Sequence, residues 1–308
     1  EKKREEFKKE LYEYVDNWEK ISTYVDIFEN ELINLYKIFK DNKITKTQLG
    51  HEVNSIIIRN EDKFNGLFSH FFCLDESNLL NNIIKNLISK IQRMKKIEEE
   101  RDELPDVDIH KNIETAFRSG FYMHFRDVMN YEGNRYQMTL PKKIANYYFV
   151  REFCYGSMFR FNSSGHFNIP YGGIAYNSKD FRKKVDYIFS NEVIKMLGNT
   201  SISNKDFETF LRENHFSNKD FIFIDPPYDS DFSDYEKKKF GKNDQLRLAD
   251  CLSTIKANFI LIIKNTDFIF NLYKNMKNIK IDSFEKSYLY NVKGRNNRDV
   301  EHLIIYNF

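Results

Sequence analysis

The sequence predicts an α/β protein in which a twisted mixed sheet follows a mainly helical region. From residue 200 onward, short apolar segments alternate with helical ones. Between residues 45 and 150, apolar side chains recur at the spacing of one helix face. The clearest stripe consists of Leu79, Leu80, Ile83, Ile84, Leu87, Ile88, Ile91 and Met94. We interpret this stripe as core packing, with a partner-binding face as the alternative.

The expected elements follow one another along the chain in three groups. Before residue 45, we expect a helix over residues 1–20, a strand at Ile21–Phe28 and a helix over residues 31–37. Glu98–Asp108 is charged and contains Pro105, so it is expected to be an exposed loop. After residue 190, strands are expected at about 200–203, 221–224, 258–263, 279–284 and 301–307, and helices at about 206–214 and 242–256.

Composition limits the classes of protein that fit the chain. Its 308 residues suffice for one large or two ordinary domains, and 41% hydrophobic content excludes wholesale disorder. The net charge of +2 is too small to indicate nucleic-acid binding by itself, so a DNA surface would be a local basic patch. Cys73, Cys154 and Cys251 are isolated, which indicates reduced thiols in a cytoplasmic protein. No apolar run reaches membrane-spanning length, the charged start does not resemble a signal peptide, and no metal-ligand spacing is present.

The most informative segment is the apolar run Phe221–Ile224 followed by Asp225-Pro226-Pro227-Tyr228. The run is typical of a buried strand in a parallel sheet. Proline lacks the backbone donor and fixes φ, so the strand ends there. The segment therefore predicts a stiff loop at the carboxyl end of a strand, where open α/β sheets bind their ligands.

The loop has the groups needed to activate the exocyclic amino group of a nucleobase. Asp225 and a backbone carbonyl held by the prolines can accept both amino hydrogens, which localises the nitrogen lone pair for attack on an electrophilic methyl group. Tyr228 offers a flat face on which an extruded base can stack. The simpler alternative is an ordinary turn after a core strand.

A second informative segment is the predicted hairpin at 159–172, with Ser-Ser-Gly at its turn. Arg160, Phe161 and Asn162 precede the turn; arginine suits guanine, asparagine suits adenine, and an aromatic ring can fill the space left by a flipped base. The alternative is a structural hairpin with cross-strand aromatic pairs. The basic residues that follow can contact backbone phosphates: Lys179, Arg182, Lys183 and Lys184.

These segments together resemble the Dam-type adenine-N6 DNA methyltransferases, whose signature is Asp-Pro-Pro-Tyr. The hairpin 159–172 is similar to the DNA-contacting hairpin of that family, and Asn204–Phe207 is similar to the segment before its catalytic strand. Lys264–Asp267 and the carboxyl-terminal residues 295–305 also resemble family segments, in the family's order. The resemblance extends from about residue 111 to 308, and more weakly from about residue 26.

The resemblance implies a Rossmann-like S-adenosylmethionine methyltransferase sheet with an inserted, mainly helical DNA-recognition domain that bears the hairpin. The implied domains are 1–44 and 191–308 for the catalytic part and 45–190 for target recognition. The implied cofactor-binding residues are Asp206, Phe207, Asp225 and Asp26. The role of Asp26, with Glu29 as the alternative, rests on its place at the end of the strand expected at Ile21–Phe28. The implied DNA-binding residues are Arg160, Phe161, Asn162, Lys183, Lys184, Arg295 and Arg298, and no metal is needed.

One departure from the family pattern is large. The family carries a Phe-x-Gly-x-Gly loop near its amino terminus, which approaches the methionine part of S-adenosylmethionine. Here Gly50, Gly66 and Gly120 are the first three glycines, and no two of them are close enough to form such a loop. We therefore expect a second subunit, in a heterodimer, to supply this loop.

The sequence thus predicts an S-adenosylmethionine-dependent, site-specific adenine-N6 methyltransferase that flips its target base out of double-stranded DNA. We expect a restriction-modification or phage-defence context. Two alternatives stay open. One is a cytosine-N4 methyltransferase, although that group usually has serine where this chain has Asp225. The other is a catalytically idle DNA-recognition subunit.

Overall fold

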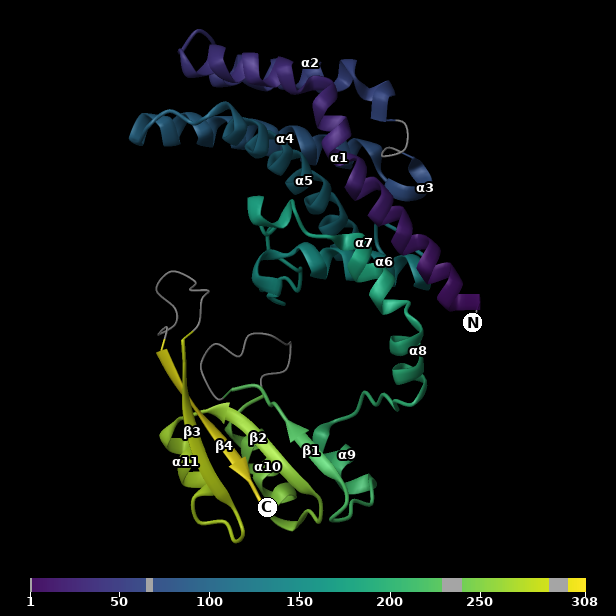
Figure 1. Ribbon diagram of the computed structural model, residues 1–308, viewed down its shortest axis with the longest axis vertical. Coiled ribbons are helices and arrows are strands. Elements are labelled where there is room, and N and C mark those ends of the chain that lie inside the picture. Colours follow the sequence, from purple (N-terminus) through teal and green to yellow (C-terminus); the bar gives the residue numbers. More distant parts are fainter. Residues whose placement is uncertain (1, 65–68, 229–239, 288–298) are drawn as a thin grey trace. The chain divides into compact units, whose positions relative to one another are not determined.

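The computed structural model describes residues 2–64, 69–228, 240–287 and 299–308 (Figure 1). The chain divides into two compact units, Glu1–Asn199 and Thr200–Phe308, which we call unit 1 and unit 2. Across the described residues, no helix is both long and apolar enough to cross a membrane. In the same part of the chain, no group of three or more His, Cys, Asp and Glu side chains is arranged to hold a metal ion.

Unit 1 is helical. Its α-helices are α1 Lys2–Lys40, α2 Lys46–Arg59, α3 His70–Cys73, α4 Glu76–Glu100, α5 Asp106–Asn130, α6 Leu140–Phe153, α7 Phe181–Ile188 and α8 Asn191–Gly198. Short 3₁₀ helices lie at Glu61–Phe64, Tyr155–Ser157 and Ile174–Tyr176. Side chains that cap the first turn begin several of these helices; Thr45, for example, accepts a hydrogen bond from the Gln48 N–H at the start of α2.

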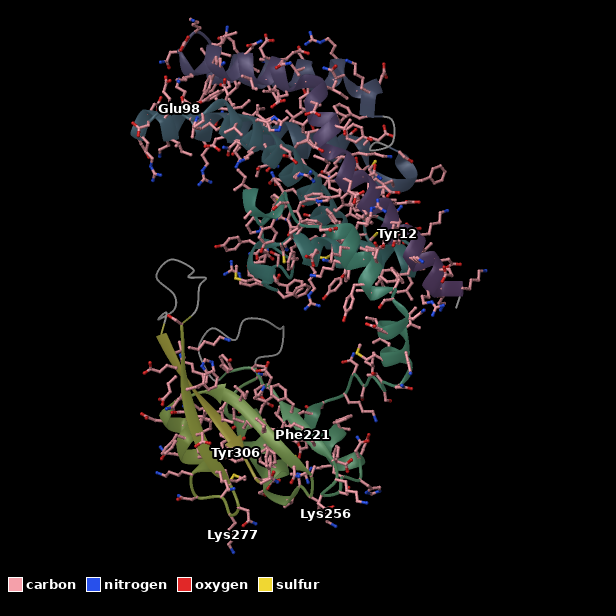
Figure 2. The ribbon with its side chains drawn as sticks, viewed as in Figure 1. Tyr12, Glu98, Phe221, Lys256, Lys277 and Tyr306 are labelled. Atoms are coloured by element: carbon pink, nitrogen blue, oxygen red, sulfur yellow. The ribbon has the colours of Figure 1, made fainter. Side chains whose placement is uncertain are left out.

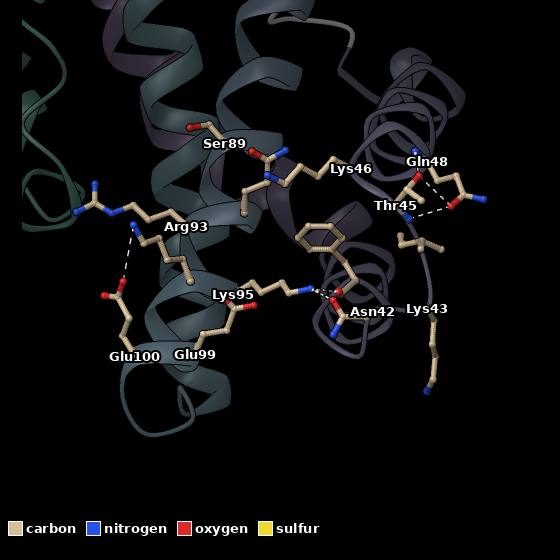
Figure 3. A pocket seen from close by; sticks show the side chains of 14 residues that line it. Asn42, Lys43, Thr45, Lys46, Gln48, Ser89, Arg93, Lys95, Glu99 and Glu100 are labelled. Carbon is tan, nitrogen blue, oxygen red and sulfur yellow. Dashed lines mark hydrogen bonds and ion pairs between the residues drawn. The ribbon is translucent and has the colours of Figure 1, made fainter.

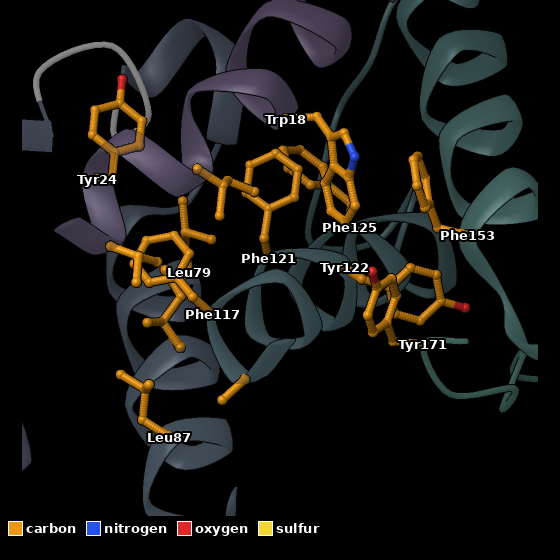
Figure 4. Packing of buried hydrophobic residues seen from close by; sticks show 14 of the residues in the cluster. Trp18, Tyr24, Leu79, Leu87, Phe117, Phe121, Tyr122, Phe125, Phe153 and Tyr171 are labelled. Atoms are coloured by element: carbon orange, nitrogen blue, oxygen red, sulfur yellow. The ribbon is translucent and has the colours of Figure 1, made fainter. Parts of the chain in front are cut away.

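The core of unit 1 is one hydrophobic cluster rich in aromatic side chains (Figure 4). Trp18 of α1 packs against Phe121 of α5 and Phe153 of α6. The α4 stripe faces this core, with Leu79, Ile83, Leu87, Ile91 and Met94 all buried, so the prediction of core packing is confirmed.

A glycine allows the close approach of α4 and α5. A Cβ atom added to Gly120 would lie 2.5 Å from the Ile83 Cα and 2.9 Å from the Asn82 carbonyl oxygen. Any side chain at this position would therefore force the two helices apart.

The strand predicted at Ile21–Phe28 is wrong, because these residues lie inside the continuous helix α1. Ile21, Val25, Phe28 and Leu32 are buried at helical spacing and form part of the core. The structure accordingly places residues 1–44 with the helical unit, whereas the sequence predicts them as part of the catalytic domain. The loop expected at Glu98–Asp108 is shorter than predicted, since α4 ends at Glu100 and α5 begins at Asp106.

Unit 2 holds the sheet. In its described part, the strands are β1 Phe221–Ile224, β2 Asn258–Lys264, β3 Lys280–Ser287 and β4 Asp299–Tyr306, in the spatial order β1-β2-β4-β3. β1 and β2 are parallel, and β4 is antiparallel to both β2 and β3, so the sheet is mixed as predicted. The helices are α9 Phe207–Glu213, α10 Lys242–Thr254 and α11 Asp267–Tyr273. The strand expected at 200–203 is not formed.

The two faces of this sheet differ. One face, formed by Phe259, Leu261, Ile263, Leu303 and Ile305, is buried under side chains of α10 and α11. The partly buried Phe207 and Leu211 of α9 pack against the same cluster. Alternation along the strands places a second apolar set on the opposite face, which we call the outer face. It consists of Phe221, Phe223, Ile260, Ile262, Phe284 and Ile304.

The edge strand β1 carries the most exposed members of the outer face. Phe221 and Phe223 are 56% and 61% exposed, and Figure 2 shows Phe221 on this strand. In the described part of unit 2, the only strand paired with β1 is β2. In the described part of unit 2, the sheet thus has an unpaired edge at β1 and a partly exposed outer face.

Candidate active site

The Asp-Pro-Pro-Tyr loop begins directly after β1, at the carboxyl end of the strand, as the sequence predicts. Asp225 and Pro227 are exposed, Pro226 is buried, and Tyr228 is half-buried. The carboxylate is therefore open to a ligand, while the first proline and the tyrosine attach the loop to the body of unit 2.

Gln245, in the first turns of α10, holds the loop by its backbone. Its side chain is fully buried, and Nε2 donates a hydrogen bond of 2.9 Å to the Pro227 carbonyl oxygen. The other amide atom, Oε1, is buried and has no hydrogen-bond partner among the described residues. Sequence reasoning missed Gln245, because nothing in the sequence links it to a loop 18 residues earlier.

His302 of β4 holds the tip of Tyr228. Its Nε2 is hydrogen-bonded to the tyrosine hydroxyl at 3.1 Å, and the two ring centroids are 5.4 Å apart. Burial, with smaller contributions from Lys286 and Lys264, lowers the pKa of His302 below its ordinary value; the Val300 backbone and Asp225 act in the opposite direction. The imidazole is therefore neutral near pH 7. Sequence reasoning missed His302, because no motif marks it.

Asp206 and Phe207 lie at the start of α9, where Asp206 caps the helix. Its Oδ1 accepts hydrogen bonds from the N–H groups of Glu208 and Thr209. Partial burial raises the pKa of Asp206, but these bonds and Arg247 outweigh that effect and lower the pKa below its ordinary value. The carboxylate is thus kept ionised and fixed in direction.

Arg247 of α10 joins these two residues. Its guanidinium donates to Asp206 at 2.7 Å and lies 4.9 Å from the centroid of the Phe207 ring. Because α10 supplies both Gln245 and Arg247, it brings the start of α9 and the Asp-Pro-Pro-Tyr loop to the same end of the sheet. Three of the residues predicted to bind the cofactor therefore lie in unit 2 at the same end of the sheet: Asp206, Phe207 and Asp225.

Asp26 is not part of that arrangement. It is an exposed residue in the middle of α1, in unit 1, and follows no strand. The prediction that it lies at a strand end is wrong, for the reason already given for Ile21–Phe28. Arg295 and Arg298 lie outside the described residues.

The hairpin at 159–172 forms as predicted. Phe161 and Phe167 form an antiparallel bridge, and Gly165 at the turn has a φ of +76°. The Asn162 side-chain oxygen accepts hydrogen bonds from the N–H groups of Ser164 and His166, so this oxygen is engaged in the turn itself. Phe161 is 37% exposed, and Arg160 is half-buried.

The basic residues after the hairpin differ in their surroundings. Arg182 is ion-paired with Asp16 and Glu19 of α1, and Lys179 and Lys184 are both paired with Glu152. Lys183 is exposed, and its ammonium group has no ion-pair partner in the part of the chain that the structure describes. Lys183 is therefore the member of this group best placed for a phosphate.

Unit 1 also contains a cleft of about 860 Å³ between the start of α2 and the end of α4 (Figure 3). Lys95 spans part of it and donates to the Phe39 carbonyl oxygen at 3.0 Å. None of the site residues predicted from the sequence lines this cleft.

Comparison with known proteins agrees with the motif and its setting. Residues 25–287 match the D12 class N6 adenine-specific DNA methyltransferases, and the chain belongs to this family. Members of the family use S-adenosylmethionine as the methyl donor. The resemblance inferred from the sequence is thereby confirmed.

Individual relatives show how much of the chain is shared. The chain is 33% identical over 168 residues to the Type II methyltransferase M.CviBI of Paramecium bursaria Chlorella virus NC1A, covering 53% of this chain and 60% of the viral protein. It is 30% identical over 240 residues to the Type II methyltransferase M.MjaIII of Methanocaldococcus jannaschii, covering 73% of this chain and 75% of that protein. It is 31% identical over 166 residues to the Retron Ec67 DNA adenine methylase of Escherichia coli, covering 53% of this chain and 54% of that protein.

Proposed function

We propose that this chain transfers a methyl group from S-adenosylmethionine to the N6 atom of a specific adenine in double-stranded DNA. The observation that carries the proposal is the Asp-Pro-Pro-Tyr loop at the carboxyl end of β1, with an exposed Asp225 and a Tyr228 that β4 holds in place. Family membership and the names of the relatives support the same chemistry. The Type II names of two relatives favour a restriction-modification context.

Two hydrogen-bond acceptors in the loop activate the amino group. Asp225 accepts a hydrogen bond from one N–H of the flipped adenine. Gln245 already donates to the Pro227 carbonyl, and we assign the Pro226 carbonyl as the acceptor for the second N–H. Tyr228 stacks on the base. After methyl transfer, the nitrogen loses a proton to solvent or to Asp225.

The residues at the start of α9 fit the adenosine part of the methyl donor. The Asp206 carboxylate can accept hydrogen bonds from amino or hydroxyl groups, and Phe207 offers an aromatic ring at the same position. S-adenosylmethionine supplies the electrophilic methyl group when bound. The sequence contains no Phe-x-Gly-x-Gly loop to bind the methionine part of the donor.

A partner subunit would complete the cofactor site and the sheet together. Strands in parallel pairs are normally covered on both faces, and an unpaired edge is a place where another strand can add. β1 has both features. Its outer edge is unpaired in the described part of unit 2, and Phe221 and Phe223 are exposed on its outer face. We infer that a polypeptide with a Phe-x-Gly-x-Gly strand–loop pairs with β1 and covers the outer face. Titration of the chain alone with S-adenosylmethionine should show weak binding, and tight, stoichiometric binding would contradict the inference.

Methyl transfer from tritiated S-adenosylmethionine into DNA tests the function directly. After digestion to nucleosides, label in N6-methyladenine is expected. Label in N4-methylcytosine would instead favour the cytosine-N4 alternative. No label in any base, with sequence-specific DNA binding retained and the cofactor loop supplied, would indicate an idle recognition subunit.

A further inference from the structure

Tyr228 is held at both ends by side chains from two different elements. Gln245 of α10 donates to the carbonyl of the peptide that precedes Tyr228, which fixes the direction in which its side chain leaves the backbone. His302 of β4 is hydrogen-bonded to its hydroxyl. The tyrosine hydroxyl lies on the axis of the bond between Cβ and the ring, so restraint at both ends fixes the direction in which the ring projects.

Both restraining residues are themselves buried. His302 is 2% exposed and pairs in register with Lys264 of β2 and Phe284 of β3. Its ring stacks on Phe284 with an angle of 23° between the planes. Gln245 is fully buried within α10. Neither side chain is open to a bound base, so any effect on a substrate must pass through the loop.

The charged groups around His302 influence its protonation state. Lys264 of β2 and Lys286 of β3 disfavour an added proton, while Asp225 of the loop favours it. With burial added, the pKa of His302 is below its ordinary value. A neutral imidazole and a neutral phenol can share one hydrogen bond in either direction, depending on the tautomer.

We propose that Gln245 and His302 are positioning residues that set the direction in which the Tyr228 ring projects before the base arrives. The inference rests on the proposed function, in which Tyr228 is the stacking face. A preformed face avoids ordering the tyrosine at the moment of binding. The competing explanation is that both residues only stabilise unit 2.

A double-mutant cycle separates these explanations in the active enzyme. His302→Asn should lower kcat/KM for DNA about tenfold and leave the KM for S-adenosylmethionine unchanged. In a Tyr228→Phe background, which lacks the hydroxyl, the same substitution should have less than about a twofold effect. Equal losses in both backgrounds would overturn the proposal. His215→Asn, on an exposed surface of the same unit, is the matched control.

Gln245→Leu keeps the volume and removes the donor, with the exposed neighbour Leu246→Gln as its control. With 2-aminopurine at the target position, Gln245→Leu and His302→Asn should change the fluorescence of the bound base, and the controls should not. Unchanged fluorescence in both variants would contradict the positioning role.

Denaturation of the chain gives a readout that does not depend on catalysis. Tyr228→Phe and His302→Asn should lower the unfolding midpoint by less together than the sum of their separate effects. If the two changes in midpoint are not additive but the parent enzyme transfers no methyl group, the proposed function is refuted and the Tyr228–His302 contact is supported. Methyl transfer with additive midpoints would refute the contact and keep the function.

Discussion

The His302 imidazole and the Tyr228 hydroxyl lie 3.1 Å apart although 74 residues separate them in the chain. This hydrogen bond ties the last strand of unit 2 to the loop that follows the edge strand. Antiparallel pairing with β2 and β3 gives β4 a fixed register. The register of β4 therefore decides whether the tyrosine has a partner, because a slip of one residue would turn His302 to the other face.

Asp225→Ala should reduce the rate of adenine methylation by about two to three orders of magnitude, since one positioned acceptor is lost. DNA binding should be retained, because Asp225 is exposed and its replacement leaves the rest of the loop in place. Single-turnover kinetics with saturating cofactor measure the rate. Asp220→Ala, before the start of β1, is the control and should keep the parental rate.

Arg247→Met should weaken S-adenosylmethionine binding about tenfold, because the guanidinium orients Asp206 and stacks on Phe207. Isothermal titration measures the affinity in the complete enzyme. Arg247 is half-buried and is also paired with Glu208 and Asp244, so its effect on folding stability is measured separately by denaturation. Arg212→Met removes a neighbouring pair to Glu208 and Asp250, and an equal loss of affinity there would refute a specific role for Arg247.

Acid should destabilise unit 1 through His124. Burial lowers the pKa of this side chain from 6.5 to about 4. Its Nε2 lies 2.7 Å from the Cys73 carbonyl oxygen and its Nδ1 lies 3.0 Å from the Asn78 amide, an arrangement that suits the neutral ring.

The unfolded chain binds the proton more readily than the folded chain. The stabilising contribution is therefore complete above pH 6.5 and is lost as the pH falls towards 4. Its size is about 3 kcal/mol. Denaturant titrations from pH 7 to pH 4 should show a steep fall that is reduced in His124→Gln and unchanged in the exposed control His51→Gln.

Gly120→Ala should destabilise unit 1 by about 1–3 kcal/mol, because the added methyl group would meet the backbone of α4. Gly50→Ala is the matched control. Gly50 is also inside a helix, but its nearest neighbour is the Ile88 Cδ1 atom at 3.8 Å, so alanine should stabilise by up to about 1 kcal/mol. Thermal unfolding of both variants gives the comparison, and a stabilising Gly120→Ala would show that α4 and α5 can move apart at little cost.

Arg160→Ala should reduce discrimination at one base of the target site by about 1–3 kcal/mol. Lys183→Ala should weaken all sequences alike and flatten the salt dependence of binding. Lys184→Ala should do so less, because Lys184 is already paired with Glu152. Binding to specific and random duplexes over a range of salt concentrations measures both effects. Equal losses on the two duplexes for Arg160→Ala would make the hairpin a structural element.

The sequence predicts the positions of β1 and β2 correctly, but the expected burial of β1 is wrong, because β1 is an edge strand with Phe221 and Phe223 exposed. Phe221–Ile224 is bounded by the prolines that follow it, and β2 forms where expected, at Asn258–Lys264. Ile21–Phe28 misled the prediction, because its apolar residues fit both a strand and one face of a helix. Only packing against α5 and α6 decides for the helix.

The residues that support the site could not be predicted in the same way. Asp225 and Tyr228 belong to a motif, so their chemistry is visible in the sequence. Gln245, Arg247 and His302 act through contacts with residues 18 to 74 positions away. Such contacts depend on strand register and on how α10 packs, and neither leaves a local pattern in the sequence.

The single tryptophan of the chain provides an optical label for one of the two units. Trp18 is 2% exposed in unit 1, with the Arg118 guanidinium 4.5 Å from its ring centroid. Its emission should therefore be blue-shifted in the folded chain and should move to the red only when the helical unit opens. Far-ultraviolet circular dichroism reports on both units. The difference between the two signals during one titration would show whether the helical unit and the sheet unit melt together.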